Sequence, residues 1–122
     1  LFDLTTTPQA TRSIGEIEGV PLVDGLTQPL TGFENHRGGT TLGSDAVPFA
    51  RVERGVGNGV GDGTEGVVQG SVIGTYMHGP VLARNPQLAD LLLAWALDMP
   101  MSELQPLDLP VVDKLRRERL QR

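Results

Sequence analysis

The sequence predicts a strand-rich α/β domain with one strong helix and a terminal helix. The 122 residues include 16 glycines and 9 prolines but only 4% aromatic residues, a composition that favours short strands joined by many turns. Glycine and proline cost about 1 and about 3 kcal/mol in a helix interior, so a long helical bundle is disfavoured. With 39% hydrophobic residues at this length, the chain can form at most one domain.

The first half of the chain is expected to be mostly strand. We expect the first twenty or so residues to be a connector into a strand. Residues 5–9 are turn-rich, and residues 12–20, which alternate only loosely, are predicted to be the strand. A clearer strand is predicted over residues 30–36, ending in a turn at residues 37–39. Another short strand is predicted over residues 49–53.

Glycine occupies every second position from residue 55 to residue 63, which predicts either a mobile loop or a tight, irregular turn. Residues 61–66 match GxGxxG, but a strand follows where a dinucleotide site requires a helix. A calcium loop is also excluded, because Val60 and Gln69 stand where carboxylates are needed.

Two strands and then a helix are expected after the glycine-rich segment. Residues 66–70 and 71–77 are both predicted as strands, the second apolar enough to be buried on both faces. Asn85 is a good helix N-cap and Pro86 suits the first helical position. The apolar residues that then recur at helical spacing are Leu88, Leu91, Leu92 and Trp95.

Residues 99–122 are expected to form a Pro-rich connector and a basic C-terminal helix, distinct from residues 1–98. The helix is predicted over residues 111–120, with too few apolar positions for deep burial. Residues 113–122 carry five basic and two acidic side chains, although the whole chain has a net charge of −5. We interpret this basic end as a solvated helix face, with a docking surface for an acidic partner as the alternative.

The composition also restricts partners and location. The acidic body of the chain argues against nucleic-acid binding, which requires neutralisation of phosphates. No run of about eighteen apolar residues and no signal peptide is present, so we expect no membrane span and a cytoplasmic location. Because the first residue is Leu rather than Met, we expect the chain to be a piece of a longer protein.

The chain has two histidines, His36 and His78, and no cysteine. It therefore supplies no thiol nucleophile, and without neighbouring ligands at metal spacing we expect no metal site. His78 directly follows the predicted strand over residues 71–77 and precedes a Gly-Pro pair. We expect it at the carboxyl end of a parallel strand, where a histidine suits proton transfer; a structural role is the alternative.

Several segments together resemble a known family. They are TGFENH (31–36), GNG (57–59), DGTEG (62–66), GTYMHGP (74–80), Asn85-Pro86 and LAD (88–90). In combination they resemble the C-terminal part of class I glutamine amidotransferases of the cobyric acid synthase (CobB/CobQ-like) type. Within that family, GFENH and GTYMHGP are most similar to the GatD subunits of lipid II isoglutaminyl synthase. The resemblance covers about residues 4–97.

The resemblance implies that the chain is the C-terminal portion of a flavodoxin-like amidotransferase domain. A cysteine attacks the side-chain amide of glutamine, His78 acts as base and then acid, and Arg12 helps to hold glutamine. It further implies an ATP-dependent, Mur-ligase-like synthetase subunit as partner, which uses the ammonia to amidate the peptidoglycan precursor lipid II. No cofactor is implied.

The chain departs from the family pattern at two points. The family's cysteine and oxyanion-hole donors belong to a segment upstream of residue 1, so we expect this chain alone to be inactive. Many class I enzymes have a glutamate two residues after the histidine, where this chain has Pro80. A dyad or a remote third residue is therefore expected, and Glu34 or another carboxylate stays open. The alternatives are an amidotransferase for corrin-ring carboxylates and a non-catalytic interaction domain.

Overall fold

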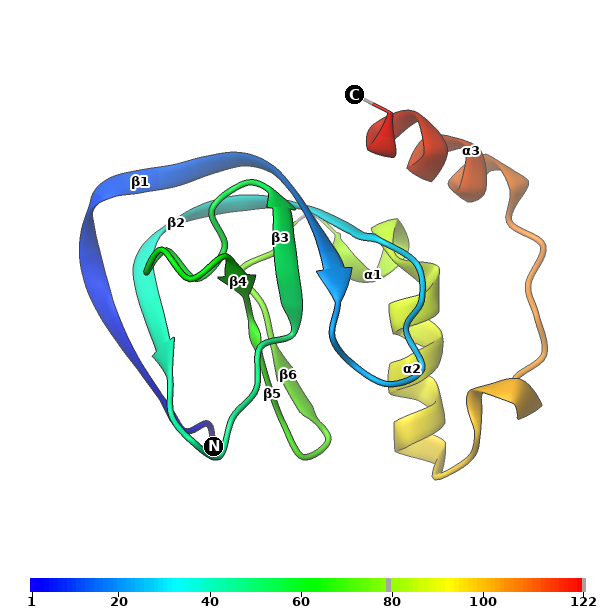
Figure 1. Cartoon of the computed structure of the whole chain (residues 1–122). Coiled ribbons are helices and arrows are strands. Elements are labelled where there is room, and N and C mark those ends of the chain that lie inside the picture. Colours follow the sequence, from blue (N-terminus) through cyan, green and yellow to red (C-terminus); the bar gives the residue numbers. More distant parts are fainter. Residues whose placement is uncertain (79, 122) are drawn as a thin grey trace.

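The computed structural model describes residues 1–78 and 80–121 (Figure 1). Gly79 of the GTYMHGP segment and Arg122 of the basic end lie outside the described residues. The strands are β1 (Leu4–Pro21), β2 (Leu30–Leu42), β3 (Ala50–Arg54), β4 (Thr64–Glu65), β5 (Val67–Gln69) and β6 (Val72–Gly74). The helices are α1 (Val81–Arg84), α2 (Pro86–Leu97), the 3-10 turn η1 (Met101–Glu103) and α3 (Pro110–Leu120).

The chain is a sheet-rich α/β structure, as the sequence predicts. One sheet has the strand order β2-β1-β3-β4, and β5 and β6 form a separate hairpin. All of these strand pairs are antiparallel. The long β1 and β2 curve together around the shorter strands, and α2 stands beside the sheet with α3 above it (Figure 1).

The two long strands extend beyond the predicted limits. The strand expected over residues 12–20 is confirmed, but β1 begins at Leu4, so the connector expected before it was wrong. β2 continues through the predicted turn at residues 37–39. The pairing tolerates Pro8 because the register shifts between Pro8 and Ser13. Gly38 does not form a turn. It leaves room for the Tyr76 side chain, since an added Cβ would lie 2.6 Å from the Tyr76 hydroxyl.

The predicted strand over residues 71–77 is also corrected. β6 has only three residues, it is half-buried, and it pairs antiparallel with β5. Residues 75–77 follow it outside any strand. His78 therefore does not stand at the carboxyl end of a parallel strand. The predictions for β3 and β5 are confirmed to within one residue at each end.

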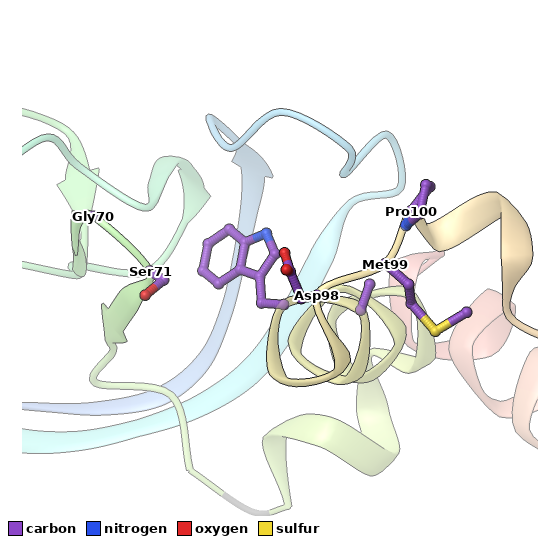
Figure 2. Close-up of a pocket in the computed structure, with 7 residues that line it drawn as sticks. Gly70, Ser71, Asp98, Met99 and Pro100 are labelled. Carbon is purple, nitrogen blue, oxygen red and sulfur yellow. The ribbon is translucent and has the colours of Figure 1, made fainter.

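The hydrophobic core lies between the sheet and α2. Its most buried members are Ile17, Leu30, Phe49, Ala50, Leu88 and Leu91. As predicted, α2 begins at Pro86, and its chain reverses at Asp98, whose φ is +51°. Trp95 packs against the core, and beside it a hollow of about 660 Å³ separates the end of α2 from the β5–β6 turn at Gly70 and Ser71 (Figure 2).

Asn85 joins β2 to the helices instead of capping α2. Its side chain makes no cap hydrogen bond. Its Oδ1 accepts from the Thr31 amide at 2.9 Å, and its Nδ2 donates to the carbonyls of Thr31 and Val81, each at 2.8 Å. This buried amide therefore satisfies the backbone of β2 in place of a neighbouring strand.

The basic helix α3 docks on the domain through one buried arginine. Arg116 is 9% exposed and donates to Asn85 Oδ1 at 2.9 Å, to the Pro29 carbonyl at 2.7 Å and to the Arg84 carbonyl. Burial lowers the pKa of its guanidinium, and the nearby Arg84 acts in the same direction. The expectation of a purely solvated helix was thus wrong at this position. Within the described residues, no helix is long and apolar enough to cross a membrane.

We expect Arg116→Ala to lower the free energy of unfolding by about 2–4 kcal/mol and to release α3, because three acceptors lose a buried charged donor. Arg117→Ala removes an exposed arginine of the same helix and should change the free energy of unfolding by less than about 0.5 kcal/mol. Denaturant unfolding and hydrogen exchange of α3 measure both effects. Similar losses in the two variants would contradict the docking described here.

Candidate active site

His78 is exposed and is held to β2 by its backbone. Its amide donates to the Phe33 carbonyl at 2.7 Å, and the two residues form an isolated antiparallel bridge. Residues directly opposed in such a bridge direct their side chains to the same face of a sheet. The imidazole of His78 therefore leaves β2 on the side of Phe33, which we call the open face.

The opposite side of β2 is its buried face. Side chains alternate along a strand, so Gly32 and Glu34 lie on this side, together with Met77. Glu34 is 2% and Met77 5% exposed, and a Cβ added at Gly32 would lie 2.7 Å from the Met77 Cβ. Met77 and His78 are neighbours in sequence but point to opposite faces of β2.

Arg12 joins His78 on the open face. Its Nη1 donates to Asn35 Oδ1 at 2.5 Å, and Asn35 lies two residues beyond Phe33 on the same face of β2. Two residues of strand span roughly 7 Å. Arg12 is exposed and also lines a cleft of about 490 Å³ between the irregular part of β1 and the glycine-rich segment. The Arg12 side chain thus contacts the open face at Asn35, and the cleft that it lines is also lined by Glu34 and Val56.

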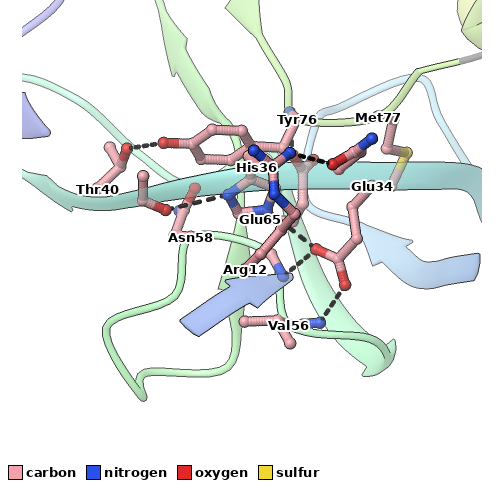
Figure 3. Close-up of polar contacts among 12 residues, drawn as sticks. Arg12, Glu34, His36, Thr40, Val56, Asn58, Glu65, Tyr76 and Met77 are labelled. Carbon is pink, nitrogen blue, oxygen red and sulfur yellow. Dashed lines mark hydrogen bonds and ion pairs between the residues drawn. The ribbon is translucent and has the colours of Figure 1, made fainter. Parts of the chain in front are cut away.

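His36, in contrast, is part of a polar network on the buried face (Figure 3). Its ring stacks on Tyr76, with centroids 3.7 Å apart and planes inclined by 12°. Its Nε2 lies 3.2 Å from Glu34 Oε2, and its Nδ1 lies 3.0 Å from the Gly38 carbonyl. This stacked and hydrogen-bonded histidine has the geometry of a structural residue.

Glu34 does not reach the open face. Its Oε1 accepts from the Val56 amide at 2.7 Å, and its Oε2 accepts from the Gly57 amide at 2.9 Å (Figure 3). Together with His36, these contacts occupy the carboxylate on the side of β2 opposite to the His78 ring. Glu34 therefore holds the glycine-rich segment and is not a direct partner of His78.

Of the two alternatives for the glycine-rich segment, the structure has the tight, irregular turn. Asn58 is 1% exposed and pairs with the backbone of Gly66, accepting from its amide at 2.9 Å and donating to its carbonyl at 3.1 Å. The Asn58 carbonyl accepts from the Thr40 amide at 2.7 Å. Gly57 has a φ of +72°, and an added Cβ would collide with the Thr64 carbonyl, so glycine is required there.

Glu65 is a second buried carboxylate, which no sequence pattern singled out as a site residue. It is 0% exposed and accepts from the Tyr76 amide at 2.5 Å and from the Thr75 hydroxyl at 2.9 and 3.0 Å. Burial raises its pKa to about 7; the hydrogen bonds from Tyr76 and Thr75 oppose this, and the charge of Glu34 adds to it. Only its place in the DGTEG segment marked it in the sequence.

The open face is bordered by an ion-pair cluster. Glu16 lies opposite Phe33 on β1, and its carboxylate accepts from Arg84 at 2.5 Å and from Arg119 at 2.6 Å. Burial raises the pKa of Glu16, but the hydrogen bonds and charges of the two arginines outweigh it and lower the net value. Among residues 1–78 and 80–121, no group of three or more His, Cys, Asp or Glu side chains could hold a metal.

Comparison with known proteins places this architecture in a family. Residues 1–86 match the model of the CobB/CobQ-like glutamine amidotransferase domain. The chain belongs to the CobB/CobQ-like glutamine amidotransferase family. This agrees with the resemblance seen in the sequence motifs, which include Glu34, Glu65 and His78.

Relatives of this amidotransferase chain fall into two groups. It is 47% identical over 66 residues to the GatD subunit of lipid II isoglutaminyl synthase from Streptococcus pneumoniae, which covers 54% of the chain and 25% of that relative. The GatD subunit from Staphylococcus aureus is 34% identical over 80% of the chain and 38% of the relative. A probable cobyric acid synthase from Methanothermobacter thermautotrophicus is 42% identical over 56% of the chain and 14% of the relative. The chain thus spans well under half of each relative.

The buried Glu65 predicts a specific pH dependence. Because its pKa of about 7 in the folded protein exceeds the ordinary 4.5, the folded state binds the proton more tightly than the unfolded state. Its contribution to stability is full below about pH 4.5 and is lost as the pH rises through 7, on the order of 3 kcal/mol in all. Glu65→Gln should remove this slope, which denaturant unfolding at pH 5 and pH 8 would measure. If the unaltered protein and Glu65→Gln lost the same free energy of unfolding between pH 5 and pH 8, Glu65 would not be the source of the pH dependence.

Proposed function

We propose that this chain is the histidine-bearing part of a glutaminase that supplies ammonia to a synthetase. One observation carries the proposal: the exposed His78 is bridged to Phe33, and the exposed Arg12 contacts Asn35, which lies two positions further along β2 on the same face. A proton-transferring imidazole and a guanidinium able to bind a carboxylate are two of the groups that glutamine hydrolysis by a cysteine nucleophile needs near one another.

In the proposed reaction, a cysteine thiol outside these 122 residues attacks the side-chain amide carbon of glutamine. His78 takes the thiol proton and delivers it to the leaving nitrogen, so that ammonia departs and a thioester remains. Water, deprotonated by His78, then releases glutamate and restores the thiol. Arg12 holds a carboxylate of glutamine while Asn35 orients the guanidinium.

The cysteine-free chain is on this proposal inactive by itself. The intact domain would be flavodoxin-like and cytoplasmic, with residues 1–98 forming its C-terminal part and residues 99–122 a connector and basic helix. Because Glu34 lies on the buried face, we propose that His78 acts without a carboxylate from β2 as the third member of a catalytic triad.

For the acceptor, we propose the peptidoglycan precursor lipid II, amidated by an ATP-dependent, Mur-ligase-like partner subunit. The identity to GatD subunits and the coverage of 80% of the chain in one of them support this. The second candidate is an amidotransferase for corrin-ring carboxylates, supported by the 42% identity to a probable cobyric acid synthase. A separate synthetase subunit fits the first candidate, and a synthetase domain fused upstream fits the second.

The decisive test is His78→Ala in the full-length natural protein. We expect ammonia release from glutamine to fall by about 10³-fold or more, because both proton transfers lose their carrier. The unfolding midpoint should be unchanged, since the imidazole is exposed. Arg51→Ala, at an exposed position of β3, is the control and should leave both quantities unchanged. Near-normal ammonia release by the His78 variant would rule out the proposal and favour a non-catalytic interaction domain.

A further inference from the structure

Tyr76 and Met77, the two residues before His78, lie outside any strand, so their amides have no strand partner. β6 ends at Gly74, and among the described residues backbone pairing with β2 begins at the bridge between Phe33 and His78. A buried or half-buried amide without a partner is costly, so this segment needs acceptors from elsewhere. Side chains supply them.

Glu65 and Thr75 provide these acceptors in a short relay. The Glu65 carboxylate accepts from the Tyr76 amide at 2.5 Å and from the Thr75 hydroxyl at 2.9 Å. The same hydroxyl accepts from the Met77 amide at 3.0 Å. With the His78 amide bonded to Phe33, three successive amides are fixed, two of them by side chains.

Glu65 is itself immobilised from both sides. Its carbonyl accepts from the Phe49 amide at 3.1 Å, and the next residue, Gly66, is clamped by the Asn58 side chain. An added Cβ at Gly66 would lie 2.5 Å from the Gly74 carbonyl, so the backbone between β4 and β5 packs directly against the end of β6. Because this region is closely packed, a change in the position of Glu65 would also shift the segment that it holds.

We propose that Glu65, acting through Thr75, is a positioning residue that sets the place of His78 on the open face of β2. This inference rests on the proposed function of His78. The carboxylate does not touch the imidazole; it fixes the backbone that carries it. Among the described residues, this buried carboxylate accepts hydrogen bonds from an amide and a hydroxyl of this one segment. Burying such a group is costly, and an apolar residue would serve packing alone better.

The test uses Thr75→Val in the full-length protein, because valine keeps the shape of threonine and removes only the hydroxyl. We expect kcat for glutamine hydrolysis to fall about 10- to 100-fold with KM changed less than about threefold, since displacing a catalytic group costs rate rather than binding. Thr75→Ser restores the hydroxyl and should return kcat to within about threefold. Hydrogen exchange of the Tyr76 and Met77 amides should accelerate in the valine variant only.

Val68→Ala is the matched control, because it removes buried volume from β5 without altering the relay. It should lower the unfolding midpoint and leave kcat unchanged. If Thr75→Val behaves like this control, or if serine fails to rescue kcat, the positioning role is overturned while the role of His78 stands. If His78→Ala retains activity, the proposed function fails, and this inference fails with it. Glu65→Gln, where it folds, should reproduce the valine phenotype.

Discussion

A single backbone hydrogen bond, from the His78 amide to the Phe33 carbonyl, decides on which side of β2 the imidazole lies. Because side chains alternate along a strand, this bond also assigns Met77 and Glu34 to the opposite face. Shifting the contact by one residue would bury the histidine and expose the methionine. The open face, and every role proposed for it, depends on this register.

The domain holds this register with buried polar side chains. Only 4% of its residues are aromatic, and its shorter strands have two to five residues. The buried carboxylates of Glu34 and Glu65 bind backbone amides that would otherwise require strand partners. Asn58 and Asn85 do the same for the glycine-rich turn and for β2. Burying a charged carboxylate is unfavourable, and burial accordingly raises the pKa of Glu65 to about 7.

Features set by local spacing could be predicted from the sequence. The apolar spacing from Leu88 onward and Pro86 at the first turn predicted α2, and the short strand predicted over residues 49–53 corresponds to β3. The continuation of β2 through Gly38 could not be predicted, because it depends on the distant Tyr76. Asn85 was expected to be a cap, but long-range contacts with Thr31 and Arg116 use its side chain.

The candidate site was predicted in part. Motifs indicated His78, although the parallel strand expected before it is absent and an antiparallel bridge holds it instead. Arg12 was indicated by resemblance, and its place beside Asn35 follows from the pairing of β1 with β2. No sequence pattern identified Glu65, because its role depends on hydrogen bonds to a segment about ten residues further along the chain. Such contacts cannot be predicted from residue type and spacing.

The most direct measurement is a crystal structure of the full-length protein with its nucleophile replaced and glutamine bound. We expect the side-chain amide of glutamine to lie next to the His78 imidazole on the Phe33 side of β2, with a carboxylate of the ligand at Arg12. Glutamine bound on the Glu34 side of β2, or on the open face away from both residues, would contradict it.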